Sequence, residues 1–193
     1  MNPQYIADNE KTLIRGYPNT YTFTKSMAER TMQKRCGNLK TAIVRPSAIT
    51  ACINEPVPGW TDSLAATGGM CLSVGMGMIH YVKCSGDTVV DIIPADLVSN
   101  LIIAAPYFRA IDENPGIHIL NSATGEHSPC NYHKFRDGVM KYVQHYPYFK
   151  QVFKPHVEPI PTELEYNVRF GLTEQLPVAI MKMASKVPGI GNK

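Results

Sequence analysis

The sequence predicts an α/β fold built on parallel strands, and three observations support this prediction. A helix-compatible stretch beginning near Thr20 is followed by an apolar run at 39–44, short enough for a strand buried on both faces. Two later apolar runs, at 87–93 and 117–121, flank a strongly apolar helix at 97–105. Strands alternating with helices are typical of a parallel sheet.

The composition is that of a folded globular chain. At 193 residues it fits one domain and can bury a substantial core. Its 44% hydrophobic and 18% charged residues exclude a disordered chain. Lys and Arg are scattered and the formal net charge is only +3, so nucleic-acid binding is not expected. No apolar run is long enough to cross a bilayer.

The cysteines indicate a reducing environment. They stand at positions 36, 52, 71, 84 and 130 and form no Cys-x-x-Cys pair. Their odd number and irregular spacing predict free thiols in an intracellular, reducing compartment. The first ten residues match neither a secretory signal nor an Arg-rich transit peptide. Both the cytosolic face of an organelle membrane and an organelle interior fit this pattern.

Tyr21 and Lys25 form the motif that carries chemistry. They lie four residues apart on the predicted helix, and residues at this spacing share one helix face. A free tyrosine has a pKa of about 10, and a nearby cation favours its phenolate. Such a pair can exchange a proton with a carbonyl undergoing hydride transfer, and the lysine can bind the ribose of a nicotinamide cofactor. The alternative is a tyrosine at the core edge beside a solvated lysine.

The first elements follow from capping signals and apolar spacing. Residues 1–18 read as an irregular lead-in with a short helix over 10–15. Thr20 is the expected cap of the next helix, which should end at Gly37. Its apolar side chains, expected in the core, are those of Phe23, Met27 and Met32.

The segment 47–60 should leave the carboxyl end of the strand, where ligands bind in open α/β sheets. Its stiff, Pro-rich part ends in Trp60, which is either a loop anchor or a substrate contact. Residues 67–82 predict a short helix and an irregular passage. Asp96 is expected to cap the helix at 97–105, which should stop near Pro106.

The last third predicts one more helix and a helical end. His127, Cys130 and His133 have a spacing that suggests zinc, but a fourth ligand is missing, so no metal site is predicted. Ser128 instead is expected to cap a helix that has Pro129 in its first turn. Residues 146–161 read as a surface loop. Residues 162–186 predict two helical stretches, interrupted at Gly171 and Pro177, that could lie on a membrane surface, on the substrate side or on a partner.

Four motifs narrow the prediction further, at residues 18–25, 45–47, 55–60 and 91–98. In this order they resemble the fatty acyl-CoA reductases, the alcohol-forming, male sterility-type members of the extended short-chain dehydrogenase/reductase superfamily. The resemblance implies the C-terminal part of a Rossmann-type domain lacking the first βαβ units. The sequence contains no Gly-rich phosphate loop and no upstream active-site serine. The resemblance further implies that residues 1–160 are the C-terminal half of the reductase domain, with substrate-side insertions. Residues 161–193 would be a helical C-terminal segment at the start of the sterile-type region.

The resemblance also implies roles. A full relative uses NADPH to reduce a fatty acyl-CoA to a primary alcohol. Tyr21 would be the general acid, and Lys25 would tune it and bind the cofactor ribose. Arg45, Pro46 and Ser47 would border the nicotinamide. Met76 stands where relatives carry a lysine, a departure that argues against catalysis by this chain.

Three hypotheses follow. The chain is part of an NADPH-dependent reductase that needs a complementing nucleotide-binding half, or a non-catalytic subunit of a larger complex, or an incomplete version of an ordinary enzyme. The first two require a protein partner over the exposed sheet edge. Fatty acyl-CoA would be the substrate if the chain is catalytic, and peripheral membrane contact is compatible with both. NADPH is not expected to bind tightly to this chain alone.

Overall fold

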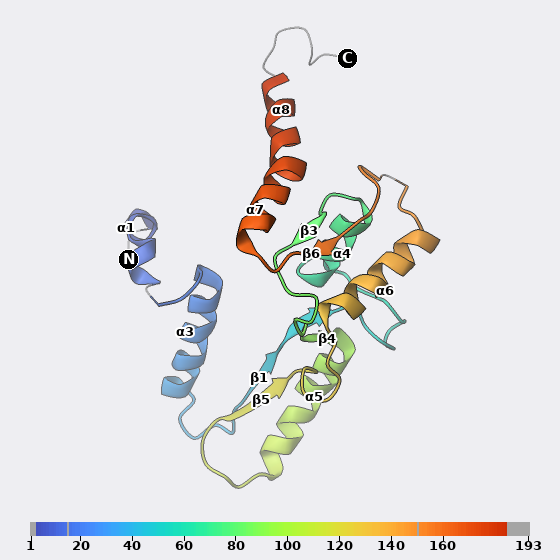
Figure 1. Ribbon diagram of the computed structural model, residues 1–193. Coiled ribbons are helices and arrows are strands. Elements are labelled where there is room, and N and C mark those ends of the chain that lie inside the picture. Colours follow the sequence, from blue (N-terminus) through green and yellow to red (C-terminus); the bar gives the residue numbers. More distant parts are fainter. Residues whose placement is uncertain (1–2, 15, 150, 185–193) are drawn as a thin grey trace. The chain divides into compact units, whose positions relative to one another are not determined.

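The computed structural model describes residues 3–14, 16–149 and 151–184 (Figure 1). By internal contacts the chain divides into two units. Unit 1 comprises Met1–Arg45 and Leu101–Leu120, and unit 2 comprises Pro46–Asn100 and Asn121–Lys193. Helices alternate with parallel strand pairs, so the predicted α/β class is confirmed.

Unit 1 begins with the short helices α1 (Pro3–Asp8) and α2 (Glu10–Leu13). The sequence predicted only the second. Proline is favoured at the first position of a helix because its missing N–H is not needed there, and Pro3 occupies that position in α1.

Helix α3 (Thr20–Arg35) follows and carries Tyr21 and Lys25. Its N-cap is Asn19, not Thr20 as predicted, because the Asn19 side chain accepts a hydrogen bond from the Thr22 amide at 2.9 Å. The predicted end is confirmed, since Gly37 follows the last turn with φ 55°. The expected core role of its apolar side is wrong: no residue of α3 is buried.

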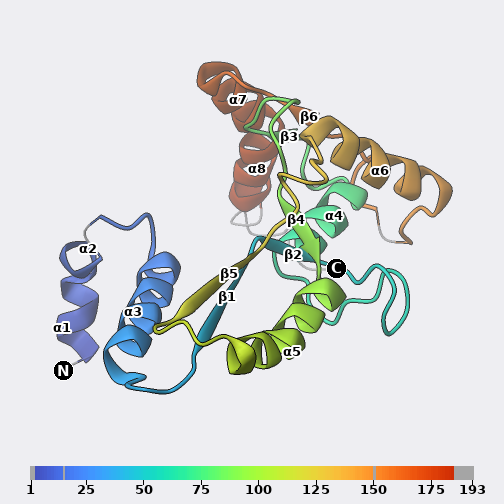
Figure 2. The ribbon, with the colours of Figure 1, turned by 90° about the horizontal axis from the view of Figure 1, so that it is seen from below.

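Strands β1 (Ala42–Pro46) and β5 (His118–Ser122) pair side by side (Figures 1 and 2). The His118 amide donates to the Thr41 carbonyl at 3.1 Å and the Ser47 amide donates to the Ser122 carbonyl at 2.9 Å, so both strands run in the same direction. The strand predicted at 39–44 therefore starts three residues late, and it is half-buried rather than enclosed on both faces.

Helix α5 (Ala95–Ile111) runs through Pro106, where the sequence predicted its end. A proline removes the hydrogen bond to the carbonyl four residues earlier, here that of Ile102. Ile102 is exposed, so water can reach this carbonyl. The helix end is closed by the guanidinium of Arg109, which is buried and donates to the carbonyls of Asp112 and Gly116.

Unit 2 holds the other two strand pairs. Strand β2 (Ala48–Thr50) pairs in parallel with β4 (Ile92–Pro94), and β3 (Tyr81–Val82) pairs in parallel with β6 (Glu158–Pro159). Strand β2 begins directly after Ser47, so the segment 47–60 does not leave the sheet at once as expected. Strand β4 is shorter than the run predicted at 87–93.

Two helices, α4 (Thr67–Gly75) and α6 (Tyr132–His145), pack beside these strands. The cap of α6 is Asn131, which accepts from the Lys134 amide at 2.9 Å, and not Ser128 as predicted. The loop expected at 146–161 contains β6. Among the described residues, the core of unit 2 consists of these buried apolar residues: Cys52, Val74, Ile93, Val98, Tyr132, Val143, Val157 and Ile160.

The C-terminal helices form one continuous rod in Figure 1. Helix α7 (Glu163–Phe170) passes through the π-helical turn η1 (Gly171–Gln175) into α8 (Leu176–Ala184). The interruption predicted at Gly171 is thus a wider turn and not a break. Pro177 lies within the continuous rod, directly after the π turn, and removes one backbone N–H there. No helix among the described residues is long and apolar enough to cross a membrane.

Candidate functional site

Tyr21 and Lys25 lie together on one exposed face of α3. The Lys25 ammonium nitrogen is 5.6 Å from the centroid of the Tyr21 ring. The Tyr21 side chain is 68% exposed. The four-residue spacing therefore places the phenol and the ammonium side by side, as the sequence predicts. This arrangement presents a proton donor and a cation to a ligand approaching α3.

The chain that leads into α3 is fixed by a contact that the sequence analysis missed. The Tyr17 hydroxyl lies 2.7 Å from the Ser26 hydroxyl, in a hydrogen bond. The Tyr17 ring packs edge-on against Phe23, with the ring centroids 5.5 Å apart. With the Asn19 cap, these contacts hold the residues just before α3 against its first two turns. Tyr17 stands directly before the motif at 18–25, and its position alone gave no sign of this role.

Arg45 binds Glu29 and not only solvent. Its Nε donates to Glu29 Oε1 at 2.9 Å, and a terminal N–H donates to the other carboxylate oxygen. This hydrogen bonding lowers the pKa of the Glu29 carboxyl and raises that of the Arg45 guanidinium. The end of β1 is thereby tied to α3. The sequence predicted a cofactor role for Arg45 and did not identify its partner, although Glu29 lies one helical turn beyond Lys25.

Pro46 is exposed at the end of β1, and Ser47 follows it in unit 2. The Ser47 amide is used in the sheet, where it donates to the Ser122 carbonyl. The carboxylate of Asp91 accepts the Thr124 amide at 2.9 Å and the Thr124 hydroxyl at 3.2 Å. The amide hydrogen bond is the main reason that the pKa of Asp91 lies below its ordinary value, and the Thr124 hydroxyl adds to this.

Asp96 holds the segment that contains the Pro-rich motif. Only 8% of the residue is exposed. Its carboxylate accepts the amides of Ile53, Asn54 and Glu55 at 2.9–3.2 Å, and that of Leu97 at 3.2 Å. Burial raises the pKa of this carboxyl, but the amide hydrogen bonds outweigh burial, so the pKa is lowered. The predicted role, accepting an amide at the start of the helix, is confirmed for Leu97. The three further amides that Asp96 accepts, at residues 53–55, were not predicted.

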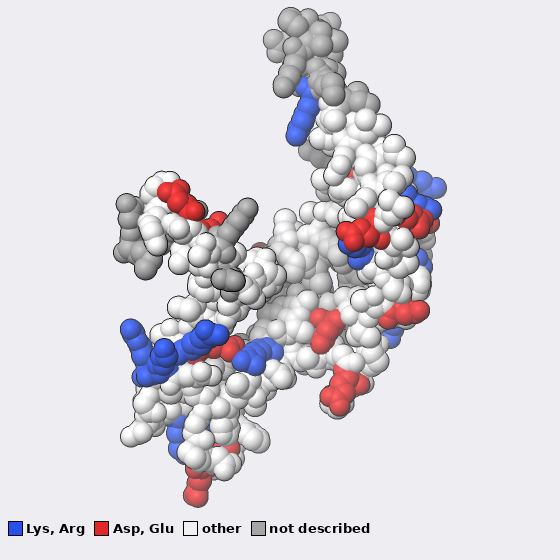
Figure 3. All heavy atoms as spheres, turned by 60° about the vertical axis from the view of Figure 1, so that its left-hand side comes forward, with Lys and Arg blue, Asp and Glu red and all other residues white. Residues whose placement is uncertain are grey.

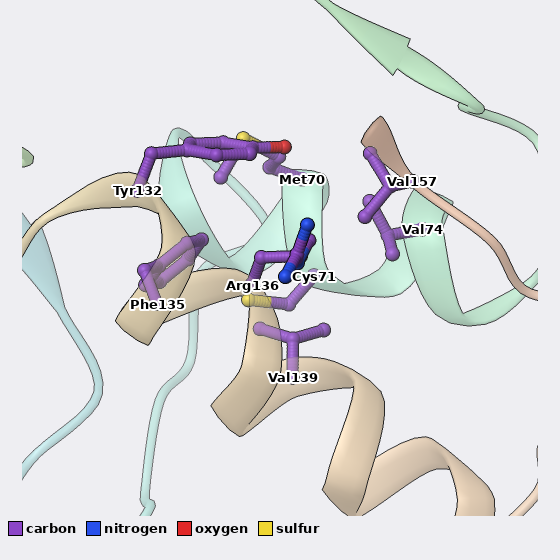
Figure 4. Close-up of a pocket in the computed structure, with 8 residues that line it drawn as sticks. All are labelled: Met70, Cys71, Val74, Tyr132, Phe135, Arg136, Val139 and Val157. Carbon is purple, nitrogen blue, oxygen red and sulfur yellow. The ribbon is translucent and has the colours of Figure 1, made fainter. Parts of the chain in front are cut away.

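A small pocket lies between α4 and α6 (Figure 4). It is lined mainly by apolar side chains, together with those of Cys71, Tyr132 and Arg136. Burial raises the pKa of Tyr132 to about 12 and also raises that of the Cys71 thiol, so both stay protonated near neutral pH. The cavity has room for little more than one water molecule, which is far below the roughly 300–1,000 Å³ of small-molecule sites. The pocket therefore does not fit an acyl-CoA.

Metal binding has no support in the part of the chain that the structure describes, where no three His, Cys, Asp or Glu side chains are grouped to hold an ion. His127, Cys130 and His133 belong to that part. All five cysteines are free thiols.

The comparison with known families decides the identity of the fold. The NAD-binding family described as male sterility protein matches residues 1–102, more than half of the 193 residues. The chain belongs to the male sterility family. The matched region contains α3, β1 and Asp96, and with them every site residue that the sequence predicted.

Curated relatives agree with the male sterility assignment. The chain is 36% identical over 189 residues to fatty acyl-CoA reductase 2 of Mus musculus and 28% identical over 189 residues to fatty acyl-CoA reductase 1 of Gallus gallus. Each alignment covers 98% of this chain and 37% of the relative. The chain thus spans little more than a third of the length of these male sterility-type relatives.

A solved structure, the UDP-glucose 4-epimerase of Thermotoga maritima in complex with UDP-glucose, is similar to the chain with a TM-score of 0.40 and 11% sequence identity. The alignment covers 83% of this chain and 52% of the epimerase.

Proposed function

We propose that this chain supplies the proton-donating side of an NADPH-dependent reductase that converts a fatty acyl-CoA to a fatty alcohol. The observation that carries the proposal is the exposed pair of Tyr21 and Lys25 on one face of α3. Membership of an NAD-binding family supports a nicotinamide cofactor. The names of the relatives support the acyl-CoA substrate.

The roles follow from the chemistry of the two side chains. A bound nicotinamide cofactor would supply a hydride to the carbonyl carbon of the thioester, after which the C–S bond breaks, CoA leaves as the thiol and an aldehyde remains. A second cofactor molecule would supply the hydride that reduces the aldehyde to the alcohol. Tyr21 holds its proton at the phenol oxygen and passes it to the carbonyl oxygen as negative charge develops there. Lys25 stabilises the phenolate that remains and donates to the cofactor ribose. Pro46 and Ser47 would border the nicotinamide through their backbone, while Arg45 is engaged by Glu29.

Unit 1 also supports the proposed need for a complementing half. Of its described residues only Ala105 and Arg109 are buried. Strands β1 and β5 pair only with each other among the described strands, although parallel sheets are normally enclosed on both sides. On α5, three large apolar side chains at four-residue spacing are exposed: Ile103, Tyr107 and Ile111. A partner that adds strands and carries the phosphate loop would cover this surface.

The test is reconstitution with a nucleotide-binding half that carries a Gly-rich phosphate loop. The mixture should oxidise NADPH with a long-chain acyl-CoA, and neither half should do so alone. Tyr21→Phe should lower kcat by about 100-fold or more, the usual contribution of a general acid, with NADPH affinity unchanged. Tyr142→Phe, which removes an exposed phenol from α6, should leave the rate unchanged. Equal rates for Tyr21→Phe and the unaltered pair would reject the assignment.

A non-catalytic subunit is the second candidate, and Met76 favours it. This residue caps the end of α4 and offers no cation where the family resemblance implies a lysine. A large assembly could cover unit 1 as well as a nucleotide-binding half could. Purification of the chain from its source separates the two, because a small Gly-rich partner indicates the reductase and a multi-subunit complex indicates the scaffold. The free thiols fit an intracellular location under both.

A further inference from the structure

An apolar stripe runs along the rod formed by α7, η1 and α8. Its members are spaced four residues apart and are all exposed: Leu164 by 75%, Val168 by 53%, Leu172 by 60% and Leu176 by 49%. Isolated exposed apolar residues are ordinary, but a continuous row on one face of a helix marks an interaction surface. The row lies in unit 2, outside the surface assigned above to a nucleotide-binding half.

The opposite face of the rod is already occupied. Tyr166 and Phe170 stack with their ring centroids 5.3 Å apart, and α7 contacts β3. The Glu174 carboxylate accepts the His80 amide at 2.9 Å. Arg169 reaches Glu165 at 2.8 Å and lies over the ring of Tyr81. The rod is therefore seated by one face, which leaves the stripe turned away from its own unit.

The π turn keeps the stripe in line. In an uninterrupted α-helix each four-residue step advances by about 40°, so three steps would wrap the row by about 120°. In η1 the Leu176 amide bonds the Gly171 carbonyl, an i to i+5 pairing that widens the turn and offsets part of this drift. The Thr173 hydroxyl caps the Arg169 carbonyl at 2.8 Å. Turns of this kind are uncommon and often occur at functional sites.

Charge is distributed unevenly along the rod. Glu163 and Glu165 stand in the first turn of α7, and Lys182 stands in the last turn of α8. Figure 3 shows a mostly white rod with blue at its far end and both colours near its base. The acidic start and the basic end are separated by the apolar row.

We propose that the stripe binds a second copy of this chain, with the two rods antiparallel about a two-fold axis near Leu172. This orientation places Val168 against Leu176 of the partner copy and Glu163 near Lys182 of the partner copy. A parallel pair would instead set acid against acid and base against base, which is unfavourable. A closed two-fold pair uses the same patch on both copies, so it satisfies both rows at once.

The size of the row sets the expected affinity. Four apolar side chains per copy bury less than a standard interface of roughly 1,600 Å². The dimer should therefore be weak and should form at concentrations of about 10 μM or above. Sedimentation velocity across a series centred on that concentration should show the mass rising from one copy to two.

Leu172→Glu tests the centre of the interface. It sets two carboxylates face to face on the two-fold axis, so the variant should stay monomeric across the whole series. Tyr142→Glu is the matched control, because Tyr142 is 58% exposed on a helix of the same unit and lies outside the stripe. It should dimerise as the unaltered chain does.

Charge reversal tests the orientation. Glu163→Lys and Lys182→Glu should each weaken the dimer by about 2- to 5-fold, the value of an exposed ion pair, and the double variant should restore it. Glu163 also lies 3.1 Å from Lys83 in its own copy. Lys83→Ala should therefore leave the dimer intact or strengthen it.

Three outcomes would overturn the proposal. The first is a monomer at every concentration. The second is a dimer that survives Leu172→Glu and is lost in Ile103→Glu, which would move the interface to α5. The third is a monomer that binds phosphatidylcholine vesicles through the stripe and loses this binding in Leu172→Glu, which would assign the row to a membrane.

Discussion

Arg45 at the end of β1 donates two hydrogen bonds to the Glu29 carboxylate of α3, with its Nε 2.9 Å from Oε1 and a terminal N–H bonded to Oε2. Glu29 continues the series of Tyr21 and Lys25 at the same four-residue spacing, so all three stand along one side of the helix. The ion pair thus ties the strand to the helix side that carries the phenol. While Arg45 is bonded to Glu29, its guanidinium orients that side of the helix and is not available to bind a ligand.

Loss of this pair should loosen α3 without unfolding the chain. In Glu29→Gln the guanidinium keeps one hydrogen bond, to the neutral amide oxygen, whereas in Glu29→Ala it keeps none. Amide hydrogen exchange in α3 should therefore quicken in the order unaltered, Gln, Ala, with thermal unfolding little changed because both side chains are partly exposed to solvent. Exchange in α6 serves as the internal control and should not move. Equal exchange in all three proteins would show that the pair does not anchor the helix.

Asp96 should control the conformation of residues 53–55. Asp96→Ala leaves three amides without their acceptor, so their exchange should approach that of an open loop. Asp96→Asn retains a carbonyl oxygen and should show an intermediate rate. The Trp60 fluorescence, which reports on the same segment, should shift to the red in the alanine variant. Unchanged protection of residues 53–55 would contradict this role.

Two glycines should respond in opposite directions to the same substitution. Gly77 has φ +72°, and a Cβ there would meet the Phe153 carbonyl, so Gly77→Ala should destabilise the fold by about 2 kcal/mol or more. Gly138 lies within α6 with open space around it, so Gly138→Ala should stabilise it by roughly 0.5–1 kcal/mol. Urea unfolding measures both. Two changes of the same sign would show that the packing around one of them is wrong.

Acid should destabilise the fold through a small set of carboxylates. The pKa values of Glu29, Asp91, Asp96 and Asp112 are lowered in the folded state, mainly by hydrogen bonds. Their stabilising contribution is complete above the unfolded values of about 4 and is lost as the pH falls through the lower folded values. The urea midpoint should hold from neutral pH to about 5 and then fall steadily. Asp91→Asn should make the midpoint fall less steeply with pH. A midpoint that rises on acidification would contradict the proposed role of these carboxylates.

The sequence predicted those features of the fold that depend on residues close to one another along the chain. Helix α3, its end at Gly37 and strand β5 follow from capping and apolar spacing, and the shared face of Tyr21 and Lys25 follows from helical geometry. The cap of α6 shows the limit of this reasoning. Ser128 and Asn131 are both good caps by residue type, and the bridge between Asn131 and Val89, far away in sequence, favours the second.

Long-range partners were out of reach of the sequence. Asp96 is a residue type that often caps helices, but three of the amides that bond its carboxylate lie more than 40 residues earlier in the chain. The burial expected for Met27 and Met32 assumed that apolar helix faces are covered, and in this chain both are exposed. Pro106 was predicted to end the helix because proline cannot bond the carbonyl four residues earlier. The exposure of Ile102, which carries that carbonyl, is a property of the folded chain and cannot be read from the sequence.

The π turn in the C-terminal rod is equivalent to a one-residue insertion into an α-helix. Deleting Thr173 should convert it to regular helix, because the wide turn already accommodates the extra residue. Leu176 would then lie eleven residues after Leu164, which is about 20° beyond three full turns, so both would still face the same side. The two ends of the rod therefore keep their relative direction whether or not the extra residue is present.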